Sequence, residues 1–191
     1  MPTDTKTALL DFAERSVRMR GIDGFSYRDL AELVGIRKAS IHYHFPTKAN
    51  LSEALMDRYH ERFTEVCANI DDTYETGGER LSALIDFYRG ALNEAQTLCL
   101  CVAFIGSRES LSDTLQSKIA AFRSMVVDWI TSTFERAHAD NSIHNAAEPR
   151  REAFSTIALL EGAHLAAHAA KDVSVFDQAL SLLRERLEVQ S

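Results

Sequence analysis

The chain has 191 residues, of which 46% are hydrophobic, and a formal net charge of −7 at pH 7. This length is enough for one or two compact units with a real core, and the negative charge argues against nonspecific DNA binding by the molecule as a whole. No apolar run reaches the roughly 18 residues that span a bilayer, and the N-terminus lacks the basic and apolar regions of a secretion signal. We therefore expect a cytoplasmic protein that does not contact a membrane.

The spacing of the apolar residues predicts an all-α fold. They recur mostly at three- and four-residue intervals, and the chain contains only three prolines and eight glycines. Helices are expected over residues 4–20, 27–33, 37–43, 48–69, 79–94, 98–107, 113–138, 149–170 and 174–189. Loops are expected at 71–78, where polar residues and two glycines gather, and at 140–147, which is mostly polar.

Capping residues mark the start of several of these helices. Ser26 and Ser174 are each followed by an aspartate three residues later, which is the spacing of a capping box. Ser112 is expected to cap the long helix that follows it, and Pro149 suits the first turn of its helix. These signals place the helix starts more firmly than the apolar spacing alone.

Residues 27–43 have the pattern of a helix-turn-helix. Two short predicted helices are joined by a three-residue turn that contains Gly35. The second helix carries Arg37, Lys38 and Ser40 at its start, where this motif meets base edges in the major groove. An ordinary three-helix core with a basic face would have the same spacing, so the pattern favours DNA binding without requiring it.

Charge is divided unevenly along the chain. Residues 1–50 carry eight Lys or Arg against six Asp or Glu, whereas residues 51–191 carry thirteen against twenty-two. A mildly basic N-terminal segment on an acidic body is typical of a protein with one polyanion-binding end. We therefore expect the N-terminal segment alone to contact nucleic acid.

The segment FSYRDLAELVGIRKASIHYHFPTKANLSEAL, residues 25–55, resembles the DNA-binding segment of the TetR family of transcriptional regulators. The shared features are the capping serine, an apolar residue followed by alanine, the glycine in the turn, and a recognition helix that ends in an aromatic-His-Phe run before Lys48. Three positions depart from the family's usual residues: His42 replaces tyrosine, Ala39 a frequent glycine, and Arg37 a small serine. All three lie on the recognition helix, where they bear on operator preference.

The resemblance implies a helix-turn-helix DNA-binding domain over residues 1–50 and a helical ligand-binding and dimerisation domain over residues 51–191. It implies a transcriptional repressor that binds a palindromic double-stranded operator as a homodimer. It also implies that a small molecule entering the C-terminal domain releases the operator.

A homodimer is also expected on physical grounds. One recognition helix buries too little surface for tight specific binding, and two half-sites one helical turn apart solve this. The last two predicted helices suit the dimer interface, because residues 159–170 are rich in small residues, which permit close helix approach. Leu180, Leu183 and Leu187 then supply apolar stripes for a bundle with a second copy.

DNA contacts are expected from side chains that can donate to phosphates or base edges. Lys48 lies in the first turn of a helix, so its side chain and the free amides of that turn form a natural phosphate clamp. For His42, base contact and packing are equally open, while Ile41 and Phe45 are expected in the core. The expected DNA-binding residues are Ser26, Tyr27, Arg37, Lys38, Ser40, His42, Tyr43, His44 and Lys48.

The C-terminal body supplies mostly apolar candidates for a ligand pocket. Each residue alone is more often ordinary core, but together they favour an apolar or aromatic small-molecule inducer. The candidates are Phe87, Tyr88, Leu92, Phe104, Phe122, Val126, Trp129, Leu160 and His164.

Two cysteines offer an alternative signal. Some TetR-like regulators carry a reactive cysteine at the start of the helix expected over 98–107, and Cys99 and Cys101 lie there. A thiol at a helix N-terminus gains reactivity, but a cysteine in so apolar a helix also packs as a small hydrophobe. With Cys67, the total of three suits reduced thiols. A thiol-based redox or electrophile-sensing repressor that uses Cys99 is therefore the alternative function.

Other functional classes have weaker support. Glu161, His164 and His168 share one helical face at a spacing that metal ligands can adopt, but a polar spine or a pocket-lining role explains them better. We therefore expect neither a metal nor a cofactor. The absence of a glycine-rich phosphate loop and a nucleophile elbow argues against an enzyme, and a protein–protein adaptor would leave the Lys and Arg cluster unexplained.

Overall fold

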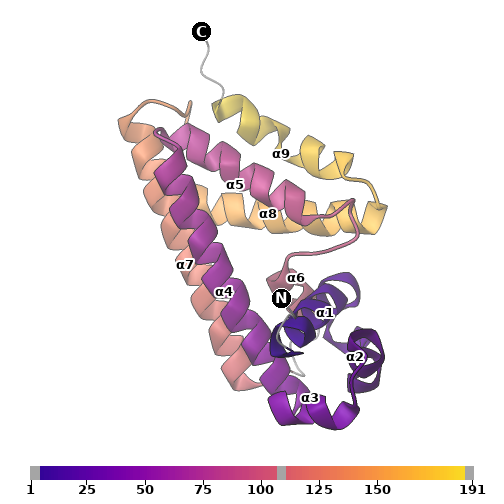
Figure 1. Ribbon diagram of the computed structural model, residues 1–191. Coiled ribbons are helices and arrows are strands. Elements are labelled where there is room, and N and C mark those ends of the chain that lie inside the picture. Colours follow the sequence, from indigo (N-terminus) through magenta and orange to yellow (C-terminus); the bar gives the residue numbers. More distant parts are fainter. Residues whose placement is uncertain (1–4, 107–110, 188–191) are drawn as a thin grey trace. The chain divides into compact units, whose positions relative to one another are not determined.

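The computed structural model describes residues 5–106 and 111–187 and is all-α over them, which confirms the predicted fold class (Figure 1). The elements are α1 (Thr5–Arg20), η1 (Ile22–Gly24), α2 (Tyr27–Val34), α3 (Lys38–His44), α4 (Lys48–Thr73), α5 (Gly77–Ala91), α6 (Leu100–Ile105), α7 (Asp113–Ala139), α8 (Pro149–Ala170) and α9 (Ser174–Leu187). None of the helices in these described stretches is long and apolar enough to cross a membrane.

The chain forms two compact units, and helices run from one into the other. The first unit consists of Met1–Glu61 with Leu100–Ala120, and the second of Arg62–Cys99 with Ala121–Ser191. Helices α4 and α7 each contribute to both units. The domain boundary expected near residue 50 stays a prediction, because a boundary in sequence need not coincide with the place where helices cross between compact units.

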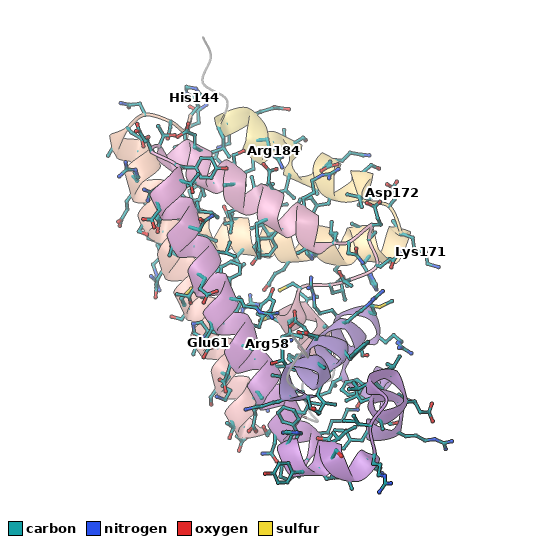
Figure 2. All side chains as sticks on the ribbon, in the orientation of Figure 1. Arg58, Glu61, His144, Lys171, Asp172 and Arg184 are labelled. Carbon is teal, nitrogen blue, oxygen red and sulfur yellow. The ribbon has the colours of Figure 1, made fainter. Side chains whose placement is uncertain are left out.

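In the first unit α1 packs against α2 and α6, and α2 packs against α3. Arg58 of α4 donates hydrogen bonds to Asp11 (2.7 Å) and Glu14 (2.6 Å), both of α1 (Figure 2). These two bonds tie α1 to α4 across the unit. Its fully buried apolar side chains include Leu9, Val17, Leu30, Ile41, Leu51, Leu55, Met56 and Phe104.

In the second unit α9 packs against α5 and α8, and aromatic rings fill much of the interior. The ring of Phe63 is edge-on to those of Phe122 and Phe87, with centroids 5.2 and 5.5 Å away. Such edge-to-face pairs are favourable beyond the apolar area they bury. This aromatic cluster therefore forms part of the core of the second unit, together with buried aliphatic side chains.

Gly77 and Gly78 begin α5 at a close approach to the C-terminal end of α7 and the loop after it. A Cβ atom on Gly77 would lie 2.3 Å from the backbone nitrogen of Ala137, and one on Gly78 would lie 2.4 Å from the Ser142 carbonyl oxygen. Their amides donate to the Asp140 carboxylate (2.8 Å) and the Ser142 hydroxyl (2.7 Å). These bonds satisfy N–H groups of the first turn that lack partners within the helix.

The loop predicted over 71–78 is wrong at both ends. Helix α4 continues to Thr73, and α5 begins at Gly77. The early start of α5 follows from a capping box that the sequence pattern did not reveal. The Thr76 hydroxyl accepts the Glu79 amide (3.2 Å), and the Glu79 carboxylate accepts the Thr76 amide (3.0 Å). Hydrogen bonds donated to the Glu79 carboxylate by the Thr76 amide (3.0 Å) and the Thr76 hydroxyl (2.9 Å) hold the pKa of Glu79 below its ordinary value.

Other predicted helix ends have mixed outcomes. The Ser112 hydroxyl caps α7 by accepting the Leu115 amide (3.1 Å), and Pro149 begins α8, so both predictions are confirmed. Ser174 is not a cap. It is the first residue of α9, and its amide donates to Asp172 (2.8 Å). Helix ends predicted at residues 4, 107 and 189 lie outside the described residues.

Candidate nucleic-acid interface and ligand-binding region

Gly35 fixes the turn between α2 and α3. Its φ of +74° lies in the left-handed region, and its amide and that of Ile36 both donate to the Ala31 carbonyl at 3.0 Å. A Cβ atom at this position would meet nothing within 4 Å. The backbone angle, and not a lack of space, therefore requires glycine here.

The start of α2 is a capping box, as predicted. The Ser26 hydroxyl accepts the Asp29 amide (3.3 Å), and the Ser26 amide donates to the Asp29 carboxylate (2.7 Å). Hydrogen bonds from the hydroxyl and the backbone of Ser26 hold the pKa of Asp29 below its ordinary value. Ser26 itself is exposed, so its position stays compatible with a phosphate contact.

Tyr27 is buried, although the sequence placed it among the DNA contacts. Its hydroxyl lies 2.9 Å from the Phe45 carbonyl oxygen and 2.6 Å from that of Thr47, and burial raises its pKa to about 12. The hydroxyl thus remains protonated and bridges α2 to the segment between α3 and α4. Nothing in the sequence pattern indicated this bridge.

Helix α3 presents one buried and one exposed face. Ile41 is 0% exposed and Phe45 at the helix end is 3% exposed, which confirms both as core. Arg37, the N-cap residue, and Lys38 are exposed and form no ion pair within the described residues. The other predicted contacts on this helix are exposed (His42, Tyr43) or half-buried (Ser40, His44).

Lys48 is held against the segment that leads into α2. Its ammonium group donates to the Phe25 carbonyl (2.7 Å) and lies 4.5 Å from the centre of the Phe25 ring. A lysine has three N–H donors, so this bond leaves two for another acceptor. Lys48 therefore both braces the unit and keeps the capacity to bind a phosphate.

These elements form one shallow concavity with a volume of about 320 Å³. Its cationic groups and its imidazole come from α3 (Lys38 and His42) and from the first turn of α4 (Lys48). The full lining is Phe25, Ser26, Tyr27, Lys38, His42, Pro46, Thr47 and Lys48. Five of the nine predicted DNA-binding residues therefore share a single surface.

Comparison with known proteins agrees with this geometry. The family model described as "Bacterial regulatory proteins, tetR family" matches residues 9–55, and the one described as "Tetracyclin repressor-like, C-terminal domain" matches residues 77–183. The chain belongs to the TetR family of transcriptional regulators. Its helix-turn-helix is therefore a DNA-binding element.

Individual relatives of the TetR family show the same relationship. The HTH-type transcriptional regulator TtgR of Pseudomonas putida is 38% identical over 58 residues, which cover 30% of this chain and only 28% of that protein. A TetR-family regulator from Agrobacterium tumefaciens superposes with a TM-score of 0.89 at 28% identity, over 96% of this chain and 97% of that one. A TetR regulator from Legionella pneumophila gives 0.87 at 24% identity, over 98% and 100% of the two chains, and shows the shared fold.

The predicted ligand residues lie mainly in cores. Phe104 is buried in the first unit, and the other eight belong to the second. Phe87 and Trp129 are half-buried, and the buried residues are Tyr88, Leu92, Phe122, Val126, Leu160 and His164. Some of these residues pack against one another: the ring centroids of Tyr88 and His164, for example, are 5.4 Å apart.

A groove of about 590 Å³ lies between α4 and α5 within the second unit. Phe87 is the one predicted ligand residue on it. Its charged groups belong to both helices, and Asp86 is paired with Arg184 of α9 at 2.5 Å. The lining is Arg62, Glu65, Val66, Asn69, Ile70, Tyr74, Ala83, Asp86 and Phe87. The sequence reading missed this groove because most of these residues are polar or exposed.

The three polar side chains on one face of α8, Glu161, His164 and His168, form hydrogen bonds within the chain. His164 Nε2 lies 2.7 Å from the Tyr88 carbonyl oxygen, and His168 Nδ1 lies 2.9 Å from that of Ala95. Among residues 5–106 and 111–187 no group of three or more His, Cys, Asp or Glu is arranged to hold a metal ion. These contacts give the spacing a structural explanation.

Glu161, the third member of that face, binds Arg123 at 2.7 and 2.8 Å. Burial raises the pKa of Glu161, although the charge and hydrogen bonds of Arg123 oppose the effect. The pair joins α7 to α8 inside the second unit.

Both cysteines of the alternative signal are buried. Cys99 is 1% exposed and directly precedes α6, while Cys101 is 0% exposed within it. At Cys67, burial and the nearby Asp71 raise the pKa of the thiol to about 12. Burial limits the access of oxidants and electrophiles, so the structure does not support a thiol sensor.

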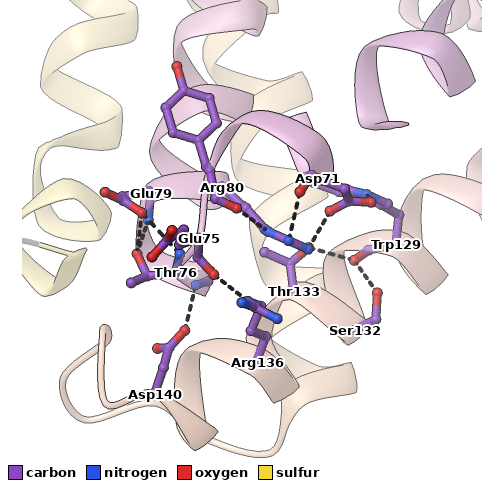
Figure 3. A network of polar contacts seen from close by, with 12 residues as sticks. Asp71, Glu75, Thr76, Glu79, Arg80, Trp129, Ser132, Thr133, Arg136 and Asp140 are labelled. Atoms are coloured by element: carbon purple, nitrogen blue, oxygen red, sulfur yellow. Dashed lines mark hydrogen bonds and ion pairs between the residues drawn. The ribbon is translucent and has the colours of Figure 1, made fainter. Parts of the chain in front are cut away.

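A polar network that the sequence did not reveal joins α4, α5 and α7 in the second unit (Figure 3). The Asp71 carboxylate accepts hydrogen bonds from Arg80 (2.6 Å) and from the indole N–H of Trp129 (2.9 Å). Arg136 donates to the Glu75 carbonyl at 2.5 Å. Trp129, a predicted ligand residue, therefore also has a structural role.

Proposed function

We propose that this chain is a ligand-responsive transcriptional repressor that binds a palindromic operator as a homodimer. The observation that carries the proposal is the exposed face of α3, where Arg37 and Lys38 have no ion-pair partner within the described residues. In a helix-turn-helix this face enters the major groove. Cations that remain unpaired on such a face are suited to phosphates and guanine edges.

Five residues of the interface have a proposed role. Arg37, at the N-cap of α3, reads a base edge. Lys38 and Lys48 bind backbone phosphates, and Tyr43, 84% exposed in the last turn of α3, adds a hydroxyl. Tyr27 is a positioning residue, since its hydroxyl is occupied by two carbonyl groups of the protein.

Exposed apolar side chains support a dimer through α8 and α9. Phe154 and Leu165 of α8 are 53% and 54% exposed, and Leu182 of α9 is 73% exposed. A second copy of the chain would bury them in an isologous interface. The leucines at 180 and 183, predicted for this surface, are instead buried inside the unit, so Leu182 takes their place.

Selection from a randomised duplex pool tests the operator proposal. Wild-type protein should enrich an inverted repeat whose half-sites are about one helical turn apart. Arg37→Ala should lose discrimination at one base pair per half-site, with affinity for other sequences little changed. Binding that occurs only at low salt and enriches no sequence would refute the repressor proposal.

The dimer is tested by sedimentation of two charge variants. Leu182→Glu should shift the protein to monomers at micromolar concentration, because it places a carboxylate in the proposed interface. Leu33→Glu is the matched control, since Leu33 is also exposed (51%) but lies on α2. A Leu182→Glu protein that stays dimeric would place the interface elsewhere.

We propose that the inducer is an apolar or aromatic small molecule and that it enters through the groove between α4 and α5. Small aromatic compounds that raise the melting temperature and release DNA would identify candidates. Asn69→Trp should then weaken their binding by filling the groove, whereas Ala68→Trp, an exposed neighbour outside the lining, should not. Equal binding to both variants would move the site into the aromatic core.

A further inference from the structure

We propose that His42 binds a DNA backbone phosphate only in its protonated form, so that operator binding takes up protons. The inference rests on the DNA-binding role proposed above and adds a chemical condition to it. It starts from the concavity between α2, α3 and α4, where His42 is the side chain that can change charge near neutral pH.

One ring nitrogen of His42 is already assigned by its neighbour. Nδ1 lies 3.1 Å from the carbonyl oxygen of Pro46. A carbonyl oxygen only accepts hydrogen bonds, so Nδ1 must carry the proton in this contact. In the neutral ring, Nε2 is then a lone-pair acceptor.

A phosphate oxygen at Nε2 would face that lone pair. Two acceptors repel each other, so the neutral ring cannot bind the phosphate and keep its bond to Pro46. The imidazolium ring carries N–H on both nitrogens and can donate to both oxygens at once. A ring held between a carbonyl and a phosphate is therefore cationic.

The groups around His42 fit an anion in this place. Lys38 lies one turn earlier on α3, and Lys48 lines the same concavity from α4. From α2, the ring of Tyr27 packs against the imidazole in a T-shaped arrangement with centroids 5.0 Å apart. Asp29 does not line the concavity, but its carboxylate accepts a hydrogen bond from the amide of Ser26, which does.

A bound phosphate makes protonation of His42 depend on DNA, since it adds negative charge beside the ring. The protonated form is therefore favoured in the complex relative to the free protein, and affinity must increase as pH falls through the range where imidazole titrates, roughly pH 5 to 8.

The experiment measures affinity against pH for the full-length protein. Fluorescence anisotropy would be recorded between about pH 5.5 and 8.5 on two duplexes, one enriched by selection and one of unrelated sequence. Wild-type affinity should rise as pH falls, with a slope steeper than that of His42→Gln by about one proton per bound protomer. Glutamine keeps a neutral donor that needs no proton, so its profile should be flatter and its affinity at high pH should equal or exceed that of the wild type.

His138→Gln is the matched control, because His138 is an exposed histidine of α7 in the second unit and is not among the expected DNA contacts; it should retain the wild-type slope. Equal slopes for wild type and His42→Gln on both duplexes would overturn the inference. Because phosphates are present in any sequence, the unrelated duplex tests His42 even if no operator is enriched. Failure of the repressor proposal and failure of this one are thereby distinguishable.

A second readout follows the ring itself. Nitrogen-15 NMR of labelled histidine should show the Nε2 resonance of His42 moving from the unprotonated to the protonated position when duplex is added at about pH 7.5. Assignment comes from the peak that is missing in His42→Gln. A His42 ring that stays neutral in the complex would refute the proposal, whatever the affinity data.

Discussion

The interface around α3 is held by contacts between residues close in sequence, whereas the second unit is held by polar contacts between distant ones. The capping box at Ser26 spans three residues, and the bridge from Tyr27 to Thr47 spans 20. In the second unit the bond from Gly78 to Ser142 spans 64 residues, and the ion pair of Arg184 with Asp86 spans 98.

The two regions also differ in whether their cationic side chains form ion pairs. Many arginines of the second unit are paired, for example Arg80 with Asp71 and Arg89 with Asp177. On α3, Arg37 and Lys38 have no such partner in the described part of the chain. Pairing thus separates arginines that support the fold from cations that are available to a polyanion.

The largest effect is expected at the start of α5. Gly77→Ala should lower the free energy of unfolding by about 3 kcal/mol or more, because its Cβ would lie 2.3 Å from a backbone atom of α7, which cannot move aside cheaply. Gly90→Ala, in the same helix with nothing within 4 Å of the added atom, should instead stabilise by about 0.5–1 kcal/mol. Urea unfolding measures both. A loss under about 1 kcal/mol for Gly77→Ala would contradict the close approach.

A second test concerns Glu152, whose carboxylate accepts hydrogen bonds from Arg186 (2.6 Å) and the Ala147 amide (2.7 Å). Burial acts to raise the pKa of Glu152, but these bonds and the charge of Arg186 outweigh it and lower the pKa. Glu152→Gln should cost about 2 kcal/mol at pH 7.

The sign of the pH dependence distinguishes two glutamates of the second unit. For Glu152 the pKa is lowered on folding, so its contribution is present above the ordinary carboxyl value, about 4.3, and is lost as pH falls through the folded pKa. For Glu161 the pKa is raised, so its contribution is present below that value and is lost as pH rises through the folded pKa. Unfolding at pH 3 to 7 should therefore show a flatter acid limb for Glu152→Gln but not for Glu161→Gln.

A smaller effect is expected at the bridge in the first unit. Tyr27→Phe should destabilise by about 1 kcal/mol, since it leaves the carbonyls of Phe45 and Thr47 without their shared donor. It should also weaken binding to all DNA sequences alike, because the bridge positions the segment before α4. Tyr43→Phe, on an exposed side chain, should leave the unfolding midpoint unchanged. A Tyr27→Phe protein with wild-type stability would show that water replaces the bridge.

Much of the first unit could be predicted because its signals are local. The left-handed angle at Gly35 and the capping pair at Ser26 depend on neighbours within four residues. Ile41 and Phe45 follow from helical spacing. The Tyr27 bridge could not be predicted, because a tyrosine at the start of a helix has no pattern that names a carbonyl acceptor 18 or 20 residues away.

More predictions were wrong in the second unit, because its contacts join residues that are far apart in the sequence. Two adjacent glycines indicate a turn in most sequences, and the contacts that require Gly77 and Gly78 lie at the C-terminal end of α7 and in the loop after it, some sixty residues later. The pocket wall expected from the aromatic spacing stays a prediction; Phe122 and Tyr88 both pack on the ring of Phe63. Spacing shows which residues turn inward, and it cannot show whether protein or ligand fills the space between them.

The smallest expected effect tests the rule about unpaired cations. Lys38→Ala should weaken binding to every duplex by about 1 kcal/mol or less near physiological salt. It should also lower the slope of log affinity against log salt by about 0.9 for each phosphate that is no longer neutralised. Arg150→Ala removes the same charge from an arginine that is paired with Asp128 in the second unit (3.1 Å). It should leave the salt slope unchanged, because a cation already paired with a carboxylate releases no counterions from DNA. Equal slopes for both variants would mean that net charge, and not the unpaired cations of α3, governs the attraction to DNA.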